Sequence, residues 1–202
     1  MSHQPSTVEP AVPSVLALNV HSVGLTDEQF EKLCRENPEL RIELTSRGEL
    51  IIIPPTGMKT GWLNSKLTQR LAEWTERDGS GLCFDSSTLF TLPDGSKRSP
   101  DASWIKGGKW EALTDEQKQS SATMAPDFVI ELCSPSDSWP LLEEKMLDYI
   151  RNGVLLGWLI DPERKLVYVY RPEQPVEILD DPATLAGDPL LPGFIFNPQE
   201  IW

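Results

Sequence analysis

One carboxylate of this sequence lies in an apolar segment, where it could do chemistry. Glu131 belongs to residues 128–133, which read FVIELC. Alternate residues of a strand point to opposite faces, and both faces of this segment are mostly apolar, as is typical of a strand covered on both sides. A carboxylate there costs free energy unless it is paired, protonated or bound to a cation. The other interpretation is a glutamate near the end of a strand that reaches water.

Asp101 is the second carboxylate that could take part in chemistry. It follows Pro100 and begins an expected strand at residues 100–105. Considered alone, it fits an aspartate that starts a strand and hydrogen-bonds the preceding loop. On a strand beside Glu131, the two carboxylates would repel each other unless a cation or a proton lay between them. Oxygen ligands with open coordination positions suit Mg²⁺ or Mn²⁺.

A lysine in the following helix adds a cation to this pair. The pattern predicts a helix over residues 139–152, and Lys145 falls inside its apolar arc. The arc consists of Leu141, Leu142, Met146, Tyr149 and Ile150. A lysine there either extends its amine to solvent or meets an acidic partner. The strand-to-helix connection brings Lys145 back over the strand that carries Glu131, so the sequence is compatible with both outcomes.

The rest of the pattern describes the elements that must hold these side chains. Thr26 and Gln29 fit a capping box at the start of a short helix, and an amphipathic helix is expected over residues 60–77. Strands are expected at residues 41–44, 49–53, 82–85, 88–92, 100–105, 127–133, 155–160, 166–170 and 176–179. The end of the chain is expected to pack on the body. The fold class is therefore α/β, with a mixed sheet.

Residue usage argues against several other kinds of site. The two histidines, His3 and His21, both lie in the poorly patterned N-terminal region, which argues against histidine-based general base chemistry. The three cysteines, Cys34, Cys83 and Cys133, form no CxxC motif and have no histidine at ligand spacing. Their odd number and wide spacing argue against a disulfide framework and a zinc site, so they are expected to be buried free thiols.

The charge of the chain limits its partners. The net charge is −13, which argues against broad, non-specific binding of nucleic acid. It does not exclude a local basic surface. Four basic residues surround Asp101 in the sequence: Lys97, Arg98, Lys106 and Lys109. They form either such a surface or, as we favour from charge alone, an ordinary solvated loop.

Length and patterning indicate the organisation of the chain. We expect a mobile N-terminal extension at residues 1–20 and a single domain at residues 21–202, long enough to close a core. No apolar run approaches the roughly 20 residues needed to span a membrane, and the first residues lack the pattern of a secretory signal. The expected location is the cytoplasm.

Several separated motifs resemble one known family. They are LRIELTSRGELIIIPPTG at residues 40–57, SPDASWI at 99–105, APDFVIELCSPSDSW at 125–139, EEKMLDYIRNGVLLGWLIDP at 143–162 and VYVYRP at 167–172. In order and spacing these resemble the Uma2 family, also called DUF820, from about residue 25 to the end. That family is similar to the PD-(D/E)xK nucleases. The resemblance implies a restriction-endonuclease-like core with an added N-terminal β-hairpin.

The resemblance also implies roles for individual residues. Asp101 matches the D of "PD" and Glu131 matches "(D/E)", so that both, with the main-chain carbonyl of Leu132, would hold one Mg²⁺ or Mn²⁺. The motif lysine should stand where this sequence has Cys133, which is a departure from the pattern. Lys145 matches a lysine that has migrated into the following helix. Glu43 matches an often acidic position of the hairpin.

The implied function is a Mg²⁺-dependent endonuclease that hydrolyses phosphodiester bonds of DNA. Cutting both strands of a duplex usually calls for two active sites, so we expect a homodimer. Two alternatives stay open. Cys133 and the acidic net charge favour a nuclease-fold protein that has lost activity and serves as a binding or assembly module. A metal-dependent phosphoesterase acting on small substrates would need no large basic surface.

Overall fold

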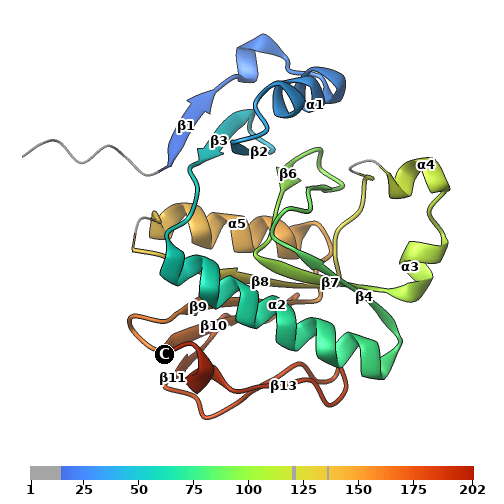
Figure 1. The fold of residues 1–202 in the computed structure, drawn as a ribbon. Coiled ribbons are helices and arrows are strands. Elements are labelled where there is room, and N and C mark those ends of the chain that lie inside the picture. Colours follow the sequence, from blue (N-terminus) through green and yellow to red (C-terminus); the bar gives the residue numbers. More distant parts are fainter. Residues whose placement is uncertain (1–14, 120–121, 136) are drawn as a thin grey trace, which may run out of the picture.

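The computed structural model describes residues 15–119, 122–135 and 137–202 of the chain. Two β-sheets and the helices that cover them make up most of the fold (Figure 1). In Figure 1 the first sheet and its helix form the upper part of the molecule, and the second sheet lies below it. The predicted α/β class with a mixed sheet is confirmed.

The first sheet has five strands: β1 (Leu16–Asn19), β2 (Arg41–Leu44), β3 (Glu49–Ile53), β5 (Phe90–Thr91) and β6 (Lys97–Arg98). Their spatial order is β1-β3-β2-β6-β5, and all neighbours are antiparallel. A 3-10 turn, η1 (His21–Val23), leads to helix α1 (Asp27–Glu36). The expected capping box of Thr26 and Gln29 is present, and Phe30 packs on Ile42 and Leu50 of the sheet. The expected hairpin is β2–β3.

The N-terminal boundary differs from the expected one. Residues 1–14 lie outside the described part of the chain, so most of the expected extension is not described. Residues 16–19, which we assigned to the extension, form β1 and pair with β3 from Leu16–Ile52 to Asn19–Glu49. This pairing satisfies a backbone edge of β3 that would otherwise be left without hydrogen bonds.

The second sheet has six strands: β4 (Gly81–Asp85), β7 (Ala102–Lys106), β8 (Phe128–Leu132), β9 (Leu156–Asp161), β10 (Leu166–Tyr170) and β11 (Glu177–Asp180). Their order is β11-β10-β9-β8-β7-β4. The central pair β8–β9 is parallel and the other pairs are antiparallel, which makes the sheet mixed. The strand β8 lies in the middle of this sheet, and its five residues are buried.

Two long helices cover opposite faces of the second sheet. They are α2 (Met58–Asp78) and α5 (Trp139–Arg151). The side chains of Leu63 and Leu67 share one apolar cluster with Phe128 and Ile130 of β8. On the other face, Met146 and Tyr149 of α5 share a cluster with Val129. The alternation predicted for β8 is therefore confirmed, and Glu131 shares its strand face with Val129.

The remaining elements close the fold. They are the helices α3 (Gly107–Glu111) and α4 (Asp115–Lys118), the strands β12 (Leu185–Ala186) and β13 (Ile195–Phe196), and the 3-10 turn η2 (Pro198–Glu200). The tail packs on the α2 face of the sheet through Leu191, Phe194 and Ile201, as expected. In the described part of the chain, no helix is both long and apolar enough to cross a membrane.

Candidate active site

The carboxylates singled out in the sequence lie near the junction of the two sheets. Asp101 directly precedes β7, and Glu131 lies in β8. These strands are antiparallel neighbours with Ala102 opposite Ile130. Continuing this register by one residue places Asp101 opposite Glu131 at the end of the ladder. The first sheet contributes Glu43 from β2, beside β6.

Lys145 points at the carboxylates and not at solvent. Its side chain is 8% exposed, and its Nζ lies 2.8 Å from Glu131 Oε1 and 2.9 Å from Glu43 Oε1. The amine also donates to the carbonyl oxygen of Ser99 at 3.1 Å. Of the two outcomes that the sequence allowed, the structure has the acidic partner. One buried amine therefore links a strand of each sheet to α5.

Asp101 is held in place by donors from three other elements. Its Oδ2 accepts the main-chain N–H of Leu132 at 2.9 Å. Its Oδ1 accepts Asn64 Nδ2 of α2 at 3.1 Å and lies 3.3 Å from Arg41 NH1 of β2. Because an ionised carboxylate only accepts hydrogen bonds, these three donors fix its orientation.

Glu43 lies at the centre of a group of buried cations. Besides Lys145, its carboxylate contacts Arg98 NH1 at 3.3 Å, and it accepts the main-chain N–H of Ser99 at 3.1 Å. Arg98 also pairs with Asp148 of α5. Buried ion pairs are strongly destabilising to break, because the remaining partner is left as an uncompensated charge. Glu43 therefore joins the hairpin to β6 and to α5.

The two glutamates have opposite pKa shifts. Burial raises the pKa of Glu131 to about 7, and the charges of Asp101 and Glu43 act in the same direction, against the effect of Lys145. Burial also acts to raise the pKa of Glu43, but three neighbouring cations outweigh it and lower this pKa to about 2. Tyr149 donates its hydroxyl to Glu131 Oε1 at 2.9 Å. Glu131 is thus the buried carboxylate whose charge is least compensated.

This environment predicts a specific dependence of stability on pH. Since the pKa of Glu131 is about 7 in the folded protein and 4.5 is its ordinary value, the folded state binds the extra proton between these pH values. The contribution of Glu131 to the free energy of unfolding therefore falls as pH rises from about 4.5 to about 7. Glu43 acts oppositely: its contribution is present above pH 4.5 and is lost as pH falls toward about 2.

The glutamine variant isolates the Glu131 contribution. Glu131→Gln keeps an oxygen that can accept from Lys145 and Tyr149 but cannot ionise. The free energy of unfolding is measured in urea with a chelator present. As pH rises from about 5 to about 8, the free energy of unfolding of the variant should increase relative to that of wild type. A variant that instead loses stability relative to wild type over this range would contradict the raised pKa.

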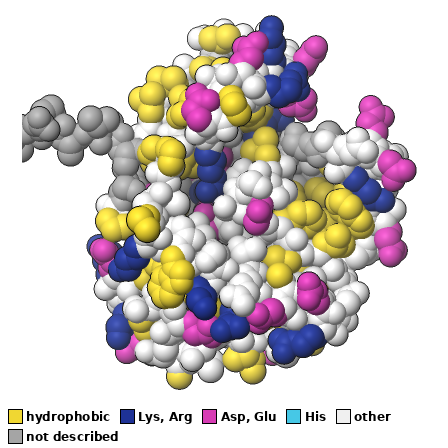
Figure 2. All heavy atoms as spheres, viewed as in Figure 1, with side chains coloured by type: hydrophobic (Ala, Val, Ile, Leu, Met, Phe, Trp, Pro, Cys, Tyr) yellow, Lys and Arg dark blue, Asp and Glu magenta, His cyan; other side chains and the backbone are white. Residues whose placement is uncertain are grey.

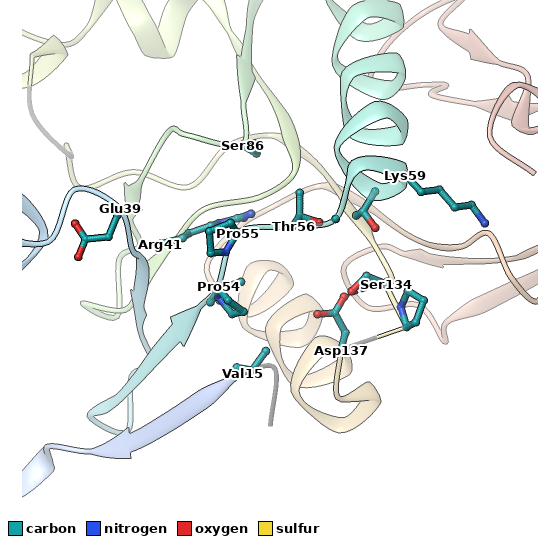
Figure 3. A pocket seen from close by; sticks show the side chains of 14 residues that line it. Val15, Glu39, Arg41, Pro54, Pro55, Thr56, Lys59, Ser86, Ser134 and Asp137 are labelled. Atoms are coloured by element: carbon teal, nitrogen blue, oxygen red, sulfur yellow. Dashed lines mark hydrogen bonds between the residues drawn. The ribbon is translucent and has the colours of Figure 1, made fainter. Parts of the chain in front are cut away.

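A cavity of about 550 Å³ opens beside Arg41. Figure 3 shows Arg41 on one side of it, Ser134 and Asp137 on the other, and Thr56 near the start of α2. Arg41 also contacts Asp101, so one side chain connects the cavity to the site. A smaller cavity of about 60 Å³ is lined by Lys145, Glu43 and Arg98 and shares Val15, Ile53 and Asp137 with the larger one. A ligand in these cavities would therefore approach the buried charges from solvent.

Of the four basic residues around Asp101, Lys106 is exposed and Lys109 is half-exposed, but Lys97 and Arg98 do not lie in the solvated loop that we favoured. The side chains of Lys97 and Arg98 are 1% and 4% exposed. Lys97 pairs with Asp27 of α1 at 2.9 Å, and Arg98 pairs with Glu43. That interpretation was wrong for this pair, because their acidic partners come from distant parts of the chain. The segment serves to join the first sheet to the site.

Cys133 has a different environment from the motif lysine whose place it takes. Its thiol is half-buried, and burial, followed by the charges of Asp161 and Asp137, raises its pKa to about 11. A neutral thiol supplies no positive charge. The three cysteines are free, as expected, but none is fully buried. The cation nearest to Glu131 is Lys145 at 2.8 Å.

The donor atoms of the site suit a hard cation. Within residues 15–119, 122–135 and 137–202, no group of three or more His, Cys, Asp or Glu side chains stands ready to hold a metal ion. The carboxylates of Asp101 and Glu131 are instead paired with Arg41 and Lys145. Asn64 Oδ1, beside Asp101, is buried and has no hydrogen-bond partner among the described residues. Carboxylate and amide oxygens are the ligands that hard divalent cations take, and Arg41, the cation that contacts Asp101, has a side chain that is 28% exposed.

The structure adds residues to the site that we had not assigned to it from the sequence. They are Arg41, Asn64, Arg98, Asp148 and Tyr149. A signal for Asn64 was available: it lies beside Leu63 and Leu67 in the apolar stripe of α2, as Lys145 lies in that of α5. Arg41 and Arg98 carry no such signal, because they stand in short strands without a long apolar pattern.

Comparison with known proteins concerns the family and the fold of the chain. The family model Uma2, described as "Putative restriction endonuclease", matches residues 27–199. Among solved structures, the fold is similar to a protein described as a "putative nuclease belonging to DUF820" from Anabaena variabilis ATCC 29413. That chain is 24% identical, with a TM-score of 0.73 over 86% of this chain and 95% of the other. Among curated proteins, none matches this sequence.

Proposed function

Because the chain belongs to the Uma2 family, we propose that it is a metal-dependent endonuclease that hydrolyses phosphodiester bonds of DNA. One observation carries the proposal. The buried amine of Lys145 lies within 2.9 Å of two carboxylates, at the end of the strand pair that carries Asp101 and Glu131. A buried charge cluster of this kind is costly for a purely structural role.

The proposed roles follow from chemistry and position. Asp101, Glu131 and the main-chain carbonyl of Leu132 would hold one Mg²⁺ or Mn²⁺. The bound cation would lower the pKa of a water and offset charge on the scissile phosphate. Lys145 positions the attacking water or stabilises the developing oxyanion. Glu43 orients Lys145 through their 2.9 Å contact and is not itself required to touch the cation.

The surface supports local contact with the substrate and not a broad electrostatic one. On the face shown in Figure 2, basic side chains are scattered among acidic ones, with no wide field of positive charge. Arg41, which lines the 550 Å³ cavity, is placed to contact a phosphate when it leaves Asp101. A homodimer, with one site for each strand of a duplex, is part of the proposal.

A second candidate has a specific observation in its favour. With Cys133 in the place of the motif lysine, and Arg41 and Lys145 already paired with the carboxylates, the site could be a retained structural cluster in a binding or assembly module. This candidate predicts that the protein binds its partner without cleaving DNA. The two candidates differ in a directly measurable activity.

The proposal is tested by incubating the purified chain with plasmid and branched DNA. Cleavage is expected with Mg²⁺ or Mn²⁺ and is expected to stop when a chelator removes the metal. Asp101→Ala and Glu131→Ala should each remove the activity. Cleavage that persists in both variants, or in the chelator, would contradict the metal mechanism.

A further inference from the structure

Asn64 has half of its side-chain amide unsatisfied. Its Nδ2 donates to Asp101 Oδ1 at 3.1 Å. Its Oδ1 is buried and has no hydrogen-bond partner within the part of the chain that the structure describes. Buried polar atoms are paired in the great majority of cases, and an exception calls for a specific explanation.

The orientation of this amide is fixed by its neighbour. An amide can be turned over to exchange its oxygen and nitrogen. Here the exchange would place Oδ1 against the carboxylate of Asp101, and two acceptors would face each other. Nδ2 therefore faces Asp101, and Oδ1 is the atom of the amide left without a partner among the described residues. The contact with Asp101 therefore explains why the oxygen, and not the nitrogen, of the Asn64 amide is left without a partner among the described residues.

The position of Asn64 in α2 points the same way. It lies between Leu63 and Leu67, both buried against the second sheet, near the N-terminal end of the helix. A polar side chain at the edge of such a stripe costs burial energy that an apolar residue would not. That cost is offset only in part by the contact with Asp101, since the carbonyl oxygen gains nothing from it.

We propose that Asn64 is a further positioning residue of the cation site, with its Oδ1 facing the divalent cation that Asp101 binds. The oxygen acts as a ligand, or as the acceptor for one cation-bound water. Mg²⁺ and Mn²⁺ take amide carbonyl oxygens as well as carboxylates, which are the two groups that Asn64 and Asp101 bring together. This inference rests on the proposed function, because it needs a cation at Asp101.

The test measures binding of Mn²⁺ in the absence of DNA, by electron paramagnetic resonance or calorimetry. Asn64→Ala should weaken Mn²⁺ binding about 10-fold or more, within the 10- to 100-fold range of residues that support metal ligands. Asn64→Asp keeps an oxygen at this position but loses the donor to Asp101. It should bind Mn²⁺ at least as tightly as wild type, whereas a role limited to the Nδ2 donor predicts that it is as weak as Asn64→Ala.

A matched control is Asn152→Ala. Asn152 also donates its Nδ2 to an aspartate, Asp94, at 2.9 Å and to the main-chain carbonyl of Asp148, and neither contact involves Asp101 or Glu131, so this variant should bind Mn²⁺ like wild type. If Asn64→Ala kept the wild-type affinity for Mn²⁺, or if Asn64→Asp and Asn64→Ala bound Mn²⁺ equally weakly, the inference about Asn64 would be overturned. The proposed function would not be affected. Absence of Mn²⁺ binding by wild type, or wild-type binding by Asp101→Asn, would overturn the proposed function and the inference with it.

Discussion

Lys145→Met is expected to lower the free energy of unfolding by about 3–5 kcal/mol and to abolish cleavage of DNA. The variant keeps most of the side-chain volume but removes the amine that lies 2.9 Å from Glu43 and 2.8 Å from Glu131. Both carboxylates are buried, so they would face each other without their shared cation. Urea unfolding at about pH 8, where Glu131 of the wild type, with a pKa of about 7, is mostly ionised, measures this cost, and loss of Lys145 raises that pKa.

A surface lysine provides the matched control. Lys32 pairs with Glu36 at 3.8 Å, but its side chain is 67% exposed. Lys32→Met should therefore change the free energy of unfolding by no more than about 0.5 kcal/mol. The double variant Lys145→Met, Glu131→Gln should recover part of the lost stability, because it removes the buried carboxylate that Lys145 no longer neutralises, whereas Glu43 keeps its pair with Arg98. If Lys145→Met and Lys32→Met changed the free energy of unfolding equally, the stabilising role of the buried ion pairs of Lys145 would be contradicted.

Glu131→Gln should separate activity from stability. It is expected to slow cleavage about 10³-fold, because a metal ion contributes several kcal/mol to catalysis and each 1.36 kcal/mol is a factor of ten. The same variant should be at least as stable as wild type at about pH 8, since it removes a buried carboxylate whose pKa is about 7. Activity and stability therefore move in opposite directions.

The measurement is single-turnover cleavage with Mn²⁺ beside urea unfolding of the same samples. Glu73→Gln is the control, because this substitution makes the same chemical change outside the site. Glu73 lies on α2, and its side chain is 45% exposed. It should cleave at the wild-type rate. If Glu131→Gln kept that rate, Glu131 would have no part in catalysis. If it lost stability and activity together, the loss of cleavage would be explained by unfolding.

Local pattern was sufficient to predict much of the fold. The capping box at Thr26, the hairpin β2–β3 and the alternation in β8 are all encoded within short segments. The place of Lys145 among apolar residues followed from the same kind of argument, through a helix periodicity of 3.6, but its burial was one of two outcomes that the sequence left open. Leu141 is the exception, because it lies in the same arc and is 36% exposed.

The partners of the site residues were beyond local pattern. Lys97 and Arg98 read as a surface segment, and their burial depends on Asp27 and Glu43, which the fold brings from more than fifty residues away. The strand expected at residues 88–92 is also reduced to Phe90–Thr91, with β6 as a neighbour that had no apolar signal. Charges that pair across two sheets leave no periodic trace in the sequence.

The same limit explains which parts of the site were missed. Asp101 and Glu131 were selected because each stands out in its own segment, whereas Arg41 becomes visible only as the contact of Asp101 and the lining of a cavity. The family pattern places its lysine where this chain has Cys133, and Lys145 matches a lysine that has migrated into the following helix. The thiol of Cys133 has a raised pKa and supplies no charge, and the amine of Lys145 in α5 lies 2.8 Å from Glu131.

The central claim is that a divalent cation held at Asp101 supports hydrolysis of DNA, and one measurement tests it most directly. Cleavage of supercoiled plasmid with Mn²⁺ is compared between wild type, Asp101→Asn and the control Asp115→Asn, whose side chain is 98% exposed in α4. The account predicts cleavage by wild type and Asp115→Asn and none by Asp101→Asn. Cleavage by Asp101→Asn at the wild-type rate, or none by wild type, would contradict it.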